Sequence, residues 1–285
     1  MSTPRVWLVT GSSSGFGRLM AEYALKRGDK VVATLRKPED LADLQGQYPN
    51  TLLVVLKLDV TQAAEIADVF ARAKAAFGRV DVVFNNAGVA GAGEIEGTPE
   101  STQRLLFDTN FFGAMNVSRE AVRFFREENA PGAGGRLVVT SSFVGITPLA
   151  CGGYYAASKH ALEAATQALA GEIAPEWNIK ITLIEPGRFR TPATTKGLFT
   201  PPLPAYAKAP SAKVWASFAK MSDPSIKIGD PNKAVAKIYE ISELPQPPLR
   251  IVFGNDAIAE CREQLESLTK AVDASVEWSK DLRED

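Results

Sequence analysis

The chain has 285 residues, and its 32 basic and 33 acidic side chains give a net charge of −1. This balance gives no electrostatic reason to expect nucleic acid or an anionic membrane as a partner. The two cysteines and the single histidine lack metal-ligand spacing, no apolar run is long enough to span a bilayer, and the first residues do not resemble a secretory signal. We therefore expect a soluble protein in a reducing compartment, the cytoplasm.

The chain opens with an expected strand, a glycine-rich turn and a helix. The apolar run 6–10 predicts a strand buried on both faces, and TGSSSGFG follows it with glycines at positions 11, 15 and 17. Glycines allow a sharp turn and let a diphosphate approach the free N–H groups of the helix expected over 18–27. The spacing is not the commonest dinucleotide fingerprint, G-x-G-x-x-G, but its place after the first strand indicates a nucleotide site.

The second expected strand, 30–35, ends at Arg36. Dinucleotide-binding sheets place an acid near this point for the ribose hydroxyls, or a base for a 2′-phosphate. This chain offers a cation there and no carboxylate, and Ser14 can donate a second hydrogen bond toward the same spot. The position therefore predicts NADP(H) in preference to NAD(H).

Strands and helices alternate along the next 150 residues. The pattern predicts a parallel, doubly wound α/β sheet with helices on both faces. After the second strand, we expect further strands over 52–58, 80–84, 137–141, 180–184 and 249–253, and helices over 38–45, 62–77, 100–112, 116–128 and from 153 to about 174.

Three polar residues follow or face the strand expected over 137–141. Ser142 comes directly after it, and Tyr155 and Lys159 lie four residues apart on one face of the next helix. A free tyrosine has a pKa of about 10, and a nearby cation lowers that value toward the range in which proton transfer is useful. The spacing alone also occurs by chance on amphipathic helices.

The character of the sequence changes between residues 186 and 230. Prolines break regular structure there, and a helix is expected over 211–221 with one apolar face. This region follows the carboxyl end of the sixth strand, where an open α/β sheet binds its ligand, so we interpret 186–230 as a substrate-binding loop and lid. An ordinary packed surface helix is the alternative. Residues 255–285 are expected to form a C-terminal helix, ending at residue 278, and a tail.

A series of motifs stands in order along the chain: TGxxxGxG at 10–17, Asp59, NNAG at 85–88, Asn110, Ser142, YxxxK at 155–159, and Pro186-Gly187 with Thr191. With these motifs the chain resembles the short-chain dehydrogenases/reductases over roughly residues 4–195, and its later part resembles the branch with steroid and retinol dehydrogenases. The resemblance implies a single Rossmann-like domain over residues 1–285, with seven mainly parallel strands in the order 3-2-1-4-5-6-7.

The resemblance also implies the roles of the site residues. Tyr155 would exchange a proton with the substrate oxygen, Ser142 would orient that oxygen, Lys159 would bind the nicotinamide ribose, and Asn110 would hold a water near Lys159. The implied cofactor-binding residues are Gly11, Ser13, Ser14, Gly15, Phe16, Gly17, Arg36, Asp59, Val60, Asn86, Ala87, Gly88, Tyr155, Lys159, Pro186, Gly187, Phe189 and Thr191.

The sequence therefore predicts an NADP(H)-dependent oxidoreductase that reduces a ketone or aldehyde, with no metal. Apolar side chains suggest a medium-sized apolar substrate; they are Phe143, Val144, Leu149, Phe189, Leu198, Phe199, Trp215, Phe218 and Met221. A non-catalytic NADP-binding sensor and a sugar-nucleotide epimerase are the alternatives. Because relatives pair through the helices matching 116–128 and 155–174, we expect a homodimer.

Overall fold

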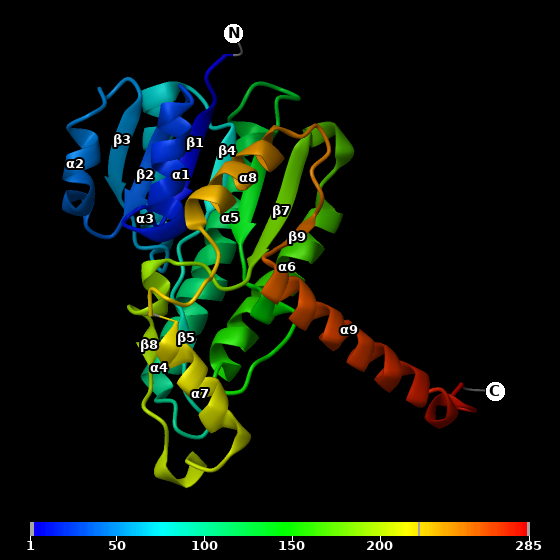
Figure 1. Ribbon diagram of the computed structural model, residues 1–285. Helices are drawn as coiled ribbons and strands as arrows, with labels where there is room; N and C mark the ends of the chain where they lie inside the picture. The colour runs from blue at the N-terminus through cyan, green and yellow to red at the C-terminus, as the bar shows by residue number, and fades with distance from the viewer. Residues whose placement is uncertain (1–2, 222, 284–285) are drawn as a thin grey trace.

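The computed structural model describes residues 3–221 and 223–283, and its centre is a seven-stranded parallel sheet (Figure 1). The strands lie in the order β3-β2-β1-β4-β6-β7-β9, and every pairing between neighbours is parallel. This confirms the predicted Rossmann-like order, with β9 at one edge. The strands are β1 (Val6–Thr10), β2 (Lys30–Leu35), β3 (Leu53–Lys57), β4 (Val82–Asn85), β6 (Gly135–Thr140), β7 (Ile179–Pro186) and β9 (Arg250–Phe253).

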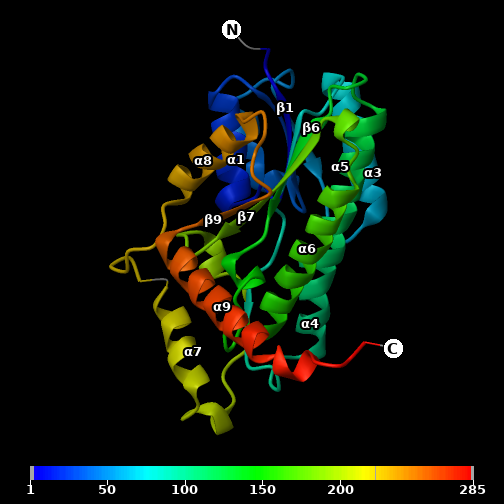
Figure 2. The same ribbon diagram turned by 90° about the vertical axis from the view of Figure 1, so that its right-hand side faces the viewer.

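Helices cover both faces of the sheet, with α1 and α8 on one face and α3, α5 and α6 on the other (Figure 2). The helices are α1 (Gly15–Lys26), α2 (Ala42–Gln45), α3 (Ala63–Phe77), α4 (Glu100–Phe107), α5 (Ala114–Glu127), α6 (Gly153–Glu172), α7 (Pro210–Lys220), α8 (Pro231–Glu243) and α9 (Asn255–Ala274). The predicted helix over 38–45 is a 3₁₀ turn at Pro38–Leu41 followed by α2.

Alternating side chains of the central strand β1 enter the two cores. Leu8 packs in the cluster beneath α3, α5 and α6, whereas Trp7 and Val9 pack beneath α1 and α8. All three are fully buried, and burial of such a side chain stabilises the fold by about 1.5–3 kcal/mol. Because both faces are covered, the strand is apolar throughout.

The helix predicted over 100–112 is interrupted. Helix α4 ends at Phe107, a π-helical segment spans Asp108–Gly113, and α5 then continues in nearly the same direction. Such widened turns often occur at functional sites. The segment carries Asn110 and turns it toward the carboxyl ends of the strands.

The sequence prediction missed two short strands. β5 (Gly91–Ala92) pairs in parallel with β8 (Leu198–Phe199), and the amide of Leu198 donates to the carbonyl of Ala90 at 2.8 Å. Two-residue strands have no periodicity to detect. Their pairing fastens the segment after β7 to the segment after β4, below the main sheet (Figure 1).

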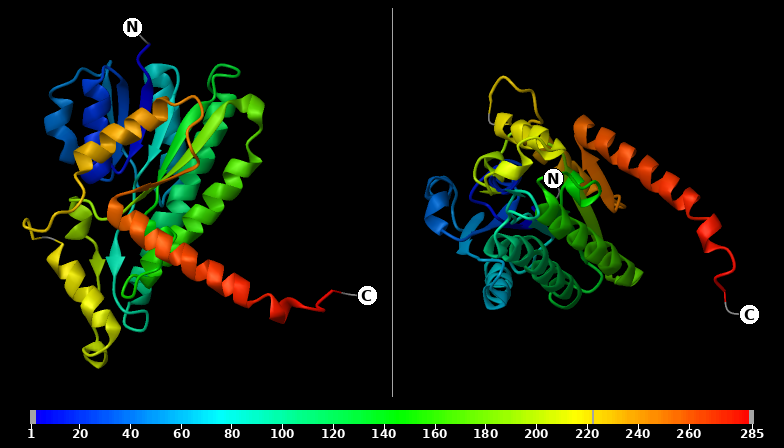
Figure 3. Two further views of the ribbon diagram at one scale, coloured as in Figure 1. Left: turned by 45° about the vertical axis from the view of Figure 1, so that its right-hand side comes forward. Right: turned by 90° about the horizontal axis from the view of Figure 1, so that it is seen from below.

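Helix α9 projects away from the rest of the molecule (Figures 1 and 3). Only its first two turns are packed, through Ala257 and Cys261 against Phe143 and Val144. The helix ends at Ala274, short of the predicted end at residue 278. Among the described residues, no helix is both long and apolar enough to cross a membrane.

Candidate active site

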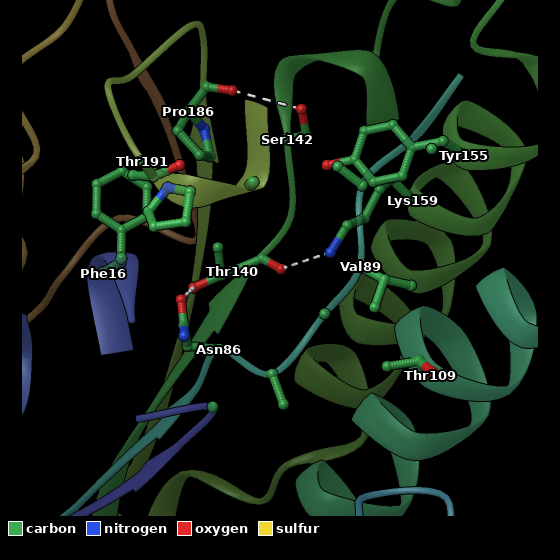
Figure 4. Close-up of a pocket in the computed structure, with 18 of the residues that line it drawn as sticks. Phe16, Asn86, Val89, Thr109, Thr140, Ser142, Tyr155, Lys159, Pro186 and Thr191 are labelled. Carbon is green, nitrogen blue, oxygen red and sulfur yellow. Dashed lines mark hydrogen bonds between the residues drawn. The ribbon is translucent and has the colours of Figure 1, made fainter. Parts of the chain in front are cut away.

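A cavity of about 420 Å³ lies at the carboxyl ends of the central strands (Figure 4). Its wall runs from the glycine-rich loop after β1, past the ends of β4 and β6, to the segment after β7. All the predicted cofactor residues line it except Gly17, and so do Ser142, Tyr155 and Lys159. Residues that are far apart in the sequence thus meet because parallel strands end at one edge of the sheet.

Gly17 lies behind the cavity wall, where α1 packs against the glycine-rich loop. A Cβ atom at this position would come within 2.3 Å of the carbonyl oxygen of Gly11, so no larger residue fits without a shift. The first turn of α1 faces the cavity through Gly15 and Phe16. The free N–H groups of a first helical turn attract an anion such as a diphosphate.

Polar side chains hold the segment after β4 in place. Thr10 Oγ1 accepts hydrogen bonds from the amides of Asn86 and Ala87, at 2.9 and 3.0 Å. The Asn86 carboxamide oxygen accepts from the Thr140 hydroxyl at 3.3 Å (Figure 4). These bonds connect the ends of β1, β4 and β6 and fix the backbone that lines the cavity.

The predicted catalytic side chains converge at one end of the cavity. Figure 4 shows the Tyr155 oxygen and the Lys159 nitrogen pointing to the same side of α6. Lys159 Nζ donates to the carbonyl of Thr140 at 3.0 Å, and the Ser142 hydroxyl donates to the carbonyl of Pro186 at 3.4 Å. Lys159 is only 4% exposed.

Asn110 lies one layer behind this group and does not line the cavity. Its carboxamide accepts from the amide of Val89 at 2.8 Å and donates to the carbonyl of Val89 at 2.9 Å and to Ser158 Oγ at 3.2 Å. A Cβ atom on Gly88 would be 3.1 Å from Asn110 Oδ1 and 3.6 Å from Lys159 Nζ. Asn110 therefore supports the backbone next to Lys159.

Residues 5–198 match the family model of the short chain dehydrogenases. The chain belongs to this family. A short-chain dehydrogenase from Streptomyces avermitilis has a similar structure, with a TM-score of 0.87 and 37% identity over 99% of this chain and 100% of that one. An uncharacterized oxidoreductase of Schizosaccharomyces pombe is 33% identical over 100% of this chain and 94% of its own length. An NADPH-dependent 3-dehydrocapnine reductase of Ornithobacterium rhinotracheale is 30% identical, with 88% of each chain covered.

Family membership makes the protein an oxidoreductase of the short-chain dehydrogenase type, and burial governs the ionisation of its central side chains. Burial raises the pKa of Tyr155, and a hydrogen bond with Ser142 opposes that rise. From the sequence we expected Lys159 to lower the pKa of the tyrosine; in the structure this pKa is raised, because burial is the largest influence on it. Burial also lowers the pKa of Lys159 to about 8, against the opposing charge of Glu163.

The cavity of this dehydrogenase is lined by most, but not all, of the predicted substrate residues. Phe143, Val144, Leu149, Phe189, Phe199, Phe218 and Met221 line it. Leu198 and Trp215 do not line it, and their contact with a substrate stays a prediction. Leu198 is turned toward a separate small pocket next to Gly91. Helix α7 reaches the cavity only with its C-terminal end, and Trp215 lies almost a turn before Phe218.

Several cavity residues were missed by the sequence analysis. The acceptor for Lys159 is the backbone carbonyl of Thr140, a group with no sequence signature. Arg188 also lines the cavity, with its guanidinium paired to Asp256 at 3.3 Å and to Glu260 at 2.7 Å. The sequence signal for Arg188 is its position directly after Pro186-Gly187. Tyr154, the residue before Tyr155, does not line this cavity and instead lines the small pocket next to Gly91.

Proposed function

We propose that the protein is an NADP(H)-dependent reductase that converts a ketone or aldehyde on a medium-sized apolar substrate to an alcohol. The observation that carries the proposal is one continuous cavity with the glycine-rich loop at one end and Ser142, Tyr155 and Lys159 at the other. The residues fit a dinucleotide, because the loop and the start of α1 offer free N–H groups to a diphosphate.

The dinucleotide would supply the hydride, and the chain's own residues would manage the substrate oxygen and its proton. Tyr155 donates the proton to the carbonyl oxygen, and Ser142 holds that oxygen by a hydrogen bond. Lys159 binds the ribose next to the reacting ring and stabilises the tyrosine when it has given up its proton. The segment after β7 reaches the glycine-rich loop, where a Cβ atom on Gly15 would lie 3.6 Å from Thr191 Cβ.

The lining supports an uncharged apolar substrate. Aromatic and aliphatic side chains are prominent in the cavity wall, among them Phe143, Phe199 and Phe218. The cation Arg188 also lines the cavity, but it is already paired with two carboxylates on α9. A charged substrate would lose its hydration there without gaining a free partner.

The choice of NADP(H) rests on Arg36. Arg36 lines the cavity at the end of β2, and among the described residues it enters no ion pair. A 2′-phosphate would find a free guanidinium at this point. The NADPH-dependent relative from Ornithobacterium rhinotracheale supports the same choice.

The test is an assay of purified protein with NADPH and a panel of aldehydes, aromatic ketones, steroids and polyketide-like ketones, read by absorbance. We expect Tyr155→Phe to lose about 10²- to 10⁴-fold in rate while it still binds NADPH, because it lacks only the proton donor. Tyr154→Phe is the matched control and should stay near wild type. If Tyr155→Phe keeps more than about a tenth of wild-type activity, the mechanism is refuted.

The same assay separates the alternatives. A non-catalytic sensor would bind NADPH and oxidise none of it with any carbonyl. An epimerase would convert its sugar nucleotide without net loss of NADPH. We further propose a homodimer formed through α5 and α6, and the cytoplasmic location stays a prediction.

A further inference from the structure

Helix α6 carries a third buried ionisable side chain in line with the tyrosine and lysine. Tyr155, Lys159 and Glu163 are spaced four residues apart, so they follow one another along one face of the helix. Glu163 is 2% exposed. We propose that Glu163 is a positioning residue of the active site: its carboxylate keeps Lys159 in the charged form and, through Ser141, fixes the turn that carries Ser142. This inference rests on the reductase function proposed above.

The Glu163 carboxylate holds the turn between β6 and α6 by direct contact. Its Oε1 accepts a hydrogen bond from Ser141 Oγ at 2.6 Å, one residue before Ser142. A Cβ atom on Gly145 would lie 2.0 Å from the same oxygen, so the turn after Ser142 approaches the carboxylate as closely as a glycine permits. A change at Glu163 therefore reaches Ser142 through one hydrogen bond and one backbone contact.

The second carboxylate oxygen faces a cation from the far end of the chain. Glu163 Oε2 pairs with Arg250 on the edge strand β9, and Arg250 Nε also pairs with Glu185 on β7 at 2.7 Å. Glu163 on α6 and Glu185 on β7 thus share one cation on the edge strand, where the Arg250 side chain is 33% exposed. The pair anchors Glu163 to the edge strand of the sheet.

The charges around this layer set the ionisation of Lys159. Burial lowers its pKa to about 8, and the charge of Glu163 raises it. Burial likewise raises the pKa of Glu185 to about 7, and it raises that of Cys261 on α9 to about 11 with the help of both carboxylates. Glu185 is therefore partly protonated near neutral pH. Burial raises the pKa of Glu163 as well, but the hydrogen bond from Ser141 and the charges of Arg250 and Lys159 lower it and so favour the anion.

A purely structural role would not require this arrangement. Two buried carboxylates and an arginine lose hydration on folding, and apolar residues of similar volume often serve the fold as well. What apolar residues cannot supply is a negative charge four residues beyond Lys159. The inference therefore predicts an effect on the titration of Lys159, in addition to any effect on stability.

The test compares Glu163→Gln with the wild type and with Glu172→Gln, a change of an exposed glutamate on the same helix. The amide that replaces the carboxylate in Glu163→Gln can still accept from Ser141 but has no charge. The pKa of Lys159 is measured from the ¹³Cε chemical shift of labelled lysine, assigned with Lys159→Arg. We expect Glu163→Gln to lower this pKa by about one unit, and Glu172→Gln to leave it unchanged.

The pH profile of carbonyl reduction gives a second reading. The loss of kcat at high pH should move to lower pH in Glu163→Gln, and Glu163→Asp, which keeps the charge, should restore its position. Ser141→Ala should lower kcat without moving the profile, because it loosens the turn and leaves the charge. A Lys159 titration that is the same in Glu163→Gln and wild type overturns the proposal.

The test still gives a result if Glu163→Gln does not fold or if the protein reduces no carbonyl of the panel. If Glu163→Gln does not fold because Arg250 lacks its partner, the double variant Glu163→Gln, Arg250→Gln replaces the ion pair by two amides. In this double variant the pKa of Lys159 should also be lowered, by less than in Glu163→Gln. An unchanged pKa of Lys159 would overturn the proposal. The chemical-shift titration needs no turnover, so a protein inactive on every carbonyl would refute the proposed function while Glu163 is still tested.

Discussion

Arg36 is one residue on which the cofactor choice can be tested. A charge-assisted hydrogen bond contributes about 1.5–3 kcal/mol, which corresponds to roughly a 10- to 150-fold preference for NADP(H) over NAD(H). Arg36→Ala should therefore raise the KM for NADPH by that factor and change the KM for NADH only a few-fold. Steady-state kinetics with both cofactors would measure it.

The neighbouring Lys37 provides the control. It carries the same charge and is also exposed, but it does not line the cavity. Lys37→Ala should leave both KM values near wild type. If the wild type uses NADH as well as NADPH, or if Arg36→Ala weakens both cofactors alike, Arg36 does not select the cofactor.

At the scale of single residues, the sequence identifies side chains whose chemistry depends on local spacing. Tyr155 and Lys159 could be paired because a helix fixes residues four apart on one face. Ser141, Glu163 and Arg250 could not be assembled this way, since their contacts join a strand end, a helix and the last strand. No local sequence pattern indicates that these three residues are in contact.

At the scale of elements, α7 supplies a test of the substrate-binding region. Phe218 lines the cavity, whereas Trp215 on the same helix does not. Phe218→Ala should raise the KM for an apolar carbonyl substrate about tenfold and leave the KM for NADPH unchanged, because it removes apolar contact only at the substrate end. Initial-rate kinetics with the best substrate of the panel would measure both values.

The matched variant is Trp215→Ala. It should change the substrate KM by no more than about threefold, because the indole does not line the cavity. Equal effects of the two substitutions would mean that α7 acts by its packing as a whole and not through a lining side chain.

Elements with strong periodicity were predicted closely, and those shaped by tertiary contact were not. β1 and β2 have the expected bounds. The π-helical turn around Asn110 was missed, because its sequence is compatible with an ordinary helix. The β5–β8 pair was missed because each strand is stabilised only by the other, roughly 100 residues away along the chain.

At the scale of the whole molecule, the order of the seven strands could be predicted from the alternation of strands with helices and from the family resemblance. The oligomeric state is a separate prediction. The small side chains Ala161, Ala164, Ala165 and Ala168 on α6 are exposed or half-buried in the single chain, which suits a close approach by a second copy. We therefore expect light scattering to give twice the chain mass of 30.6 kDa.

A charge on that face should separate the subunits. Ala168→Arg is expected to shift the mass toward that of one chain, while Ala75→Arg, at an exposed position on α3, should not. A wild-type mass of 30.6 kDa would contradict the dimer, and a mass four times as large would show a further interface.

The shared partner of Glu163 and Glu185 has a consequence for biosynthesis. Arg250 is made after helices α1 to α8 and after every other strand of the main sheet, so until then the nascent chain holds two carboxylates in this layer without their cation. Buried charges that lack a partner destabilise a fold strongly. Glu163 and Glu185 therefore gain their shared partner, Arg250, only when β9 joins the edge of the sheet. Correct assembly of the active site waits for roughly the final tenth of the chain to leave the ribosome.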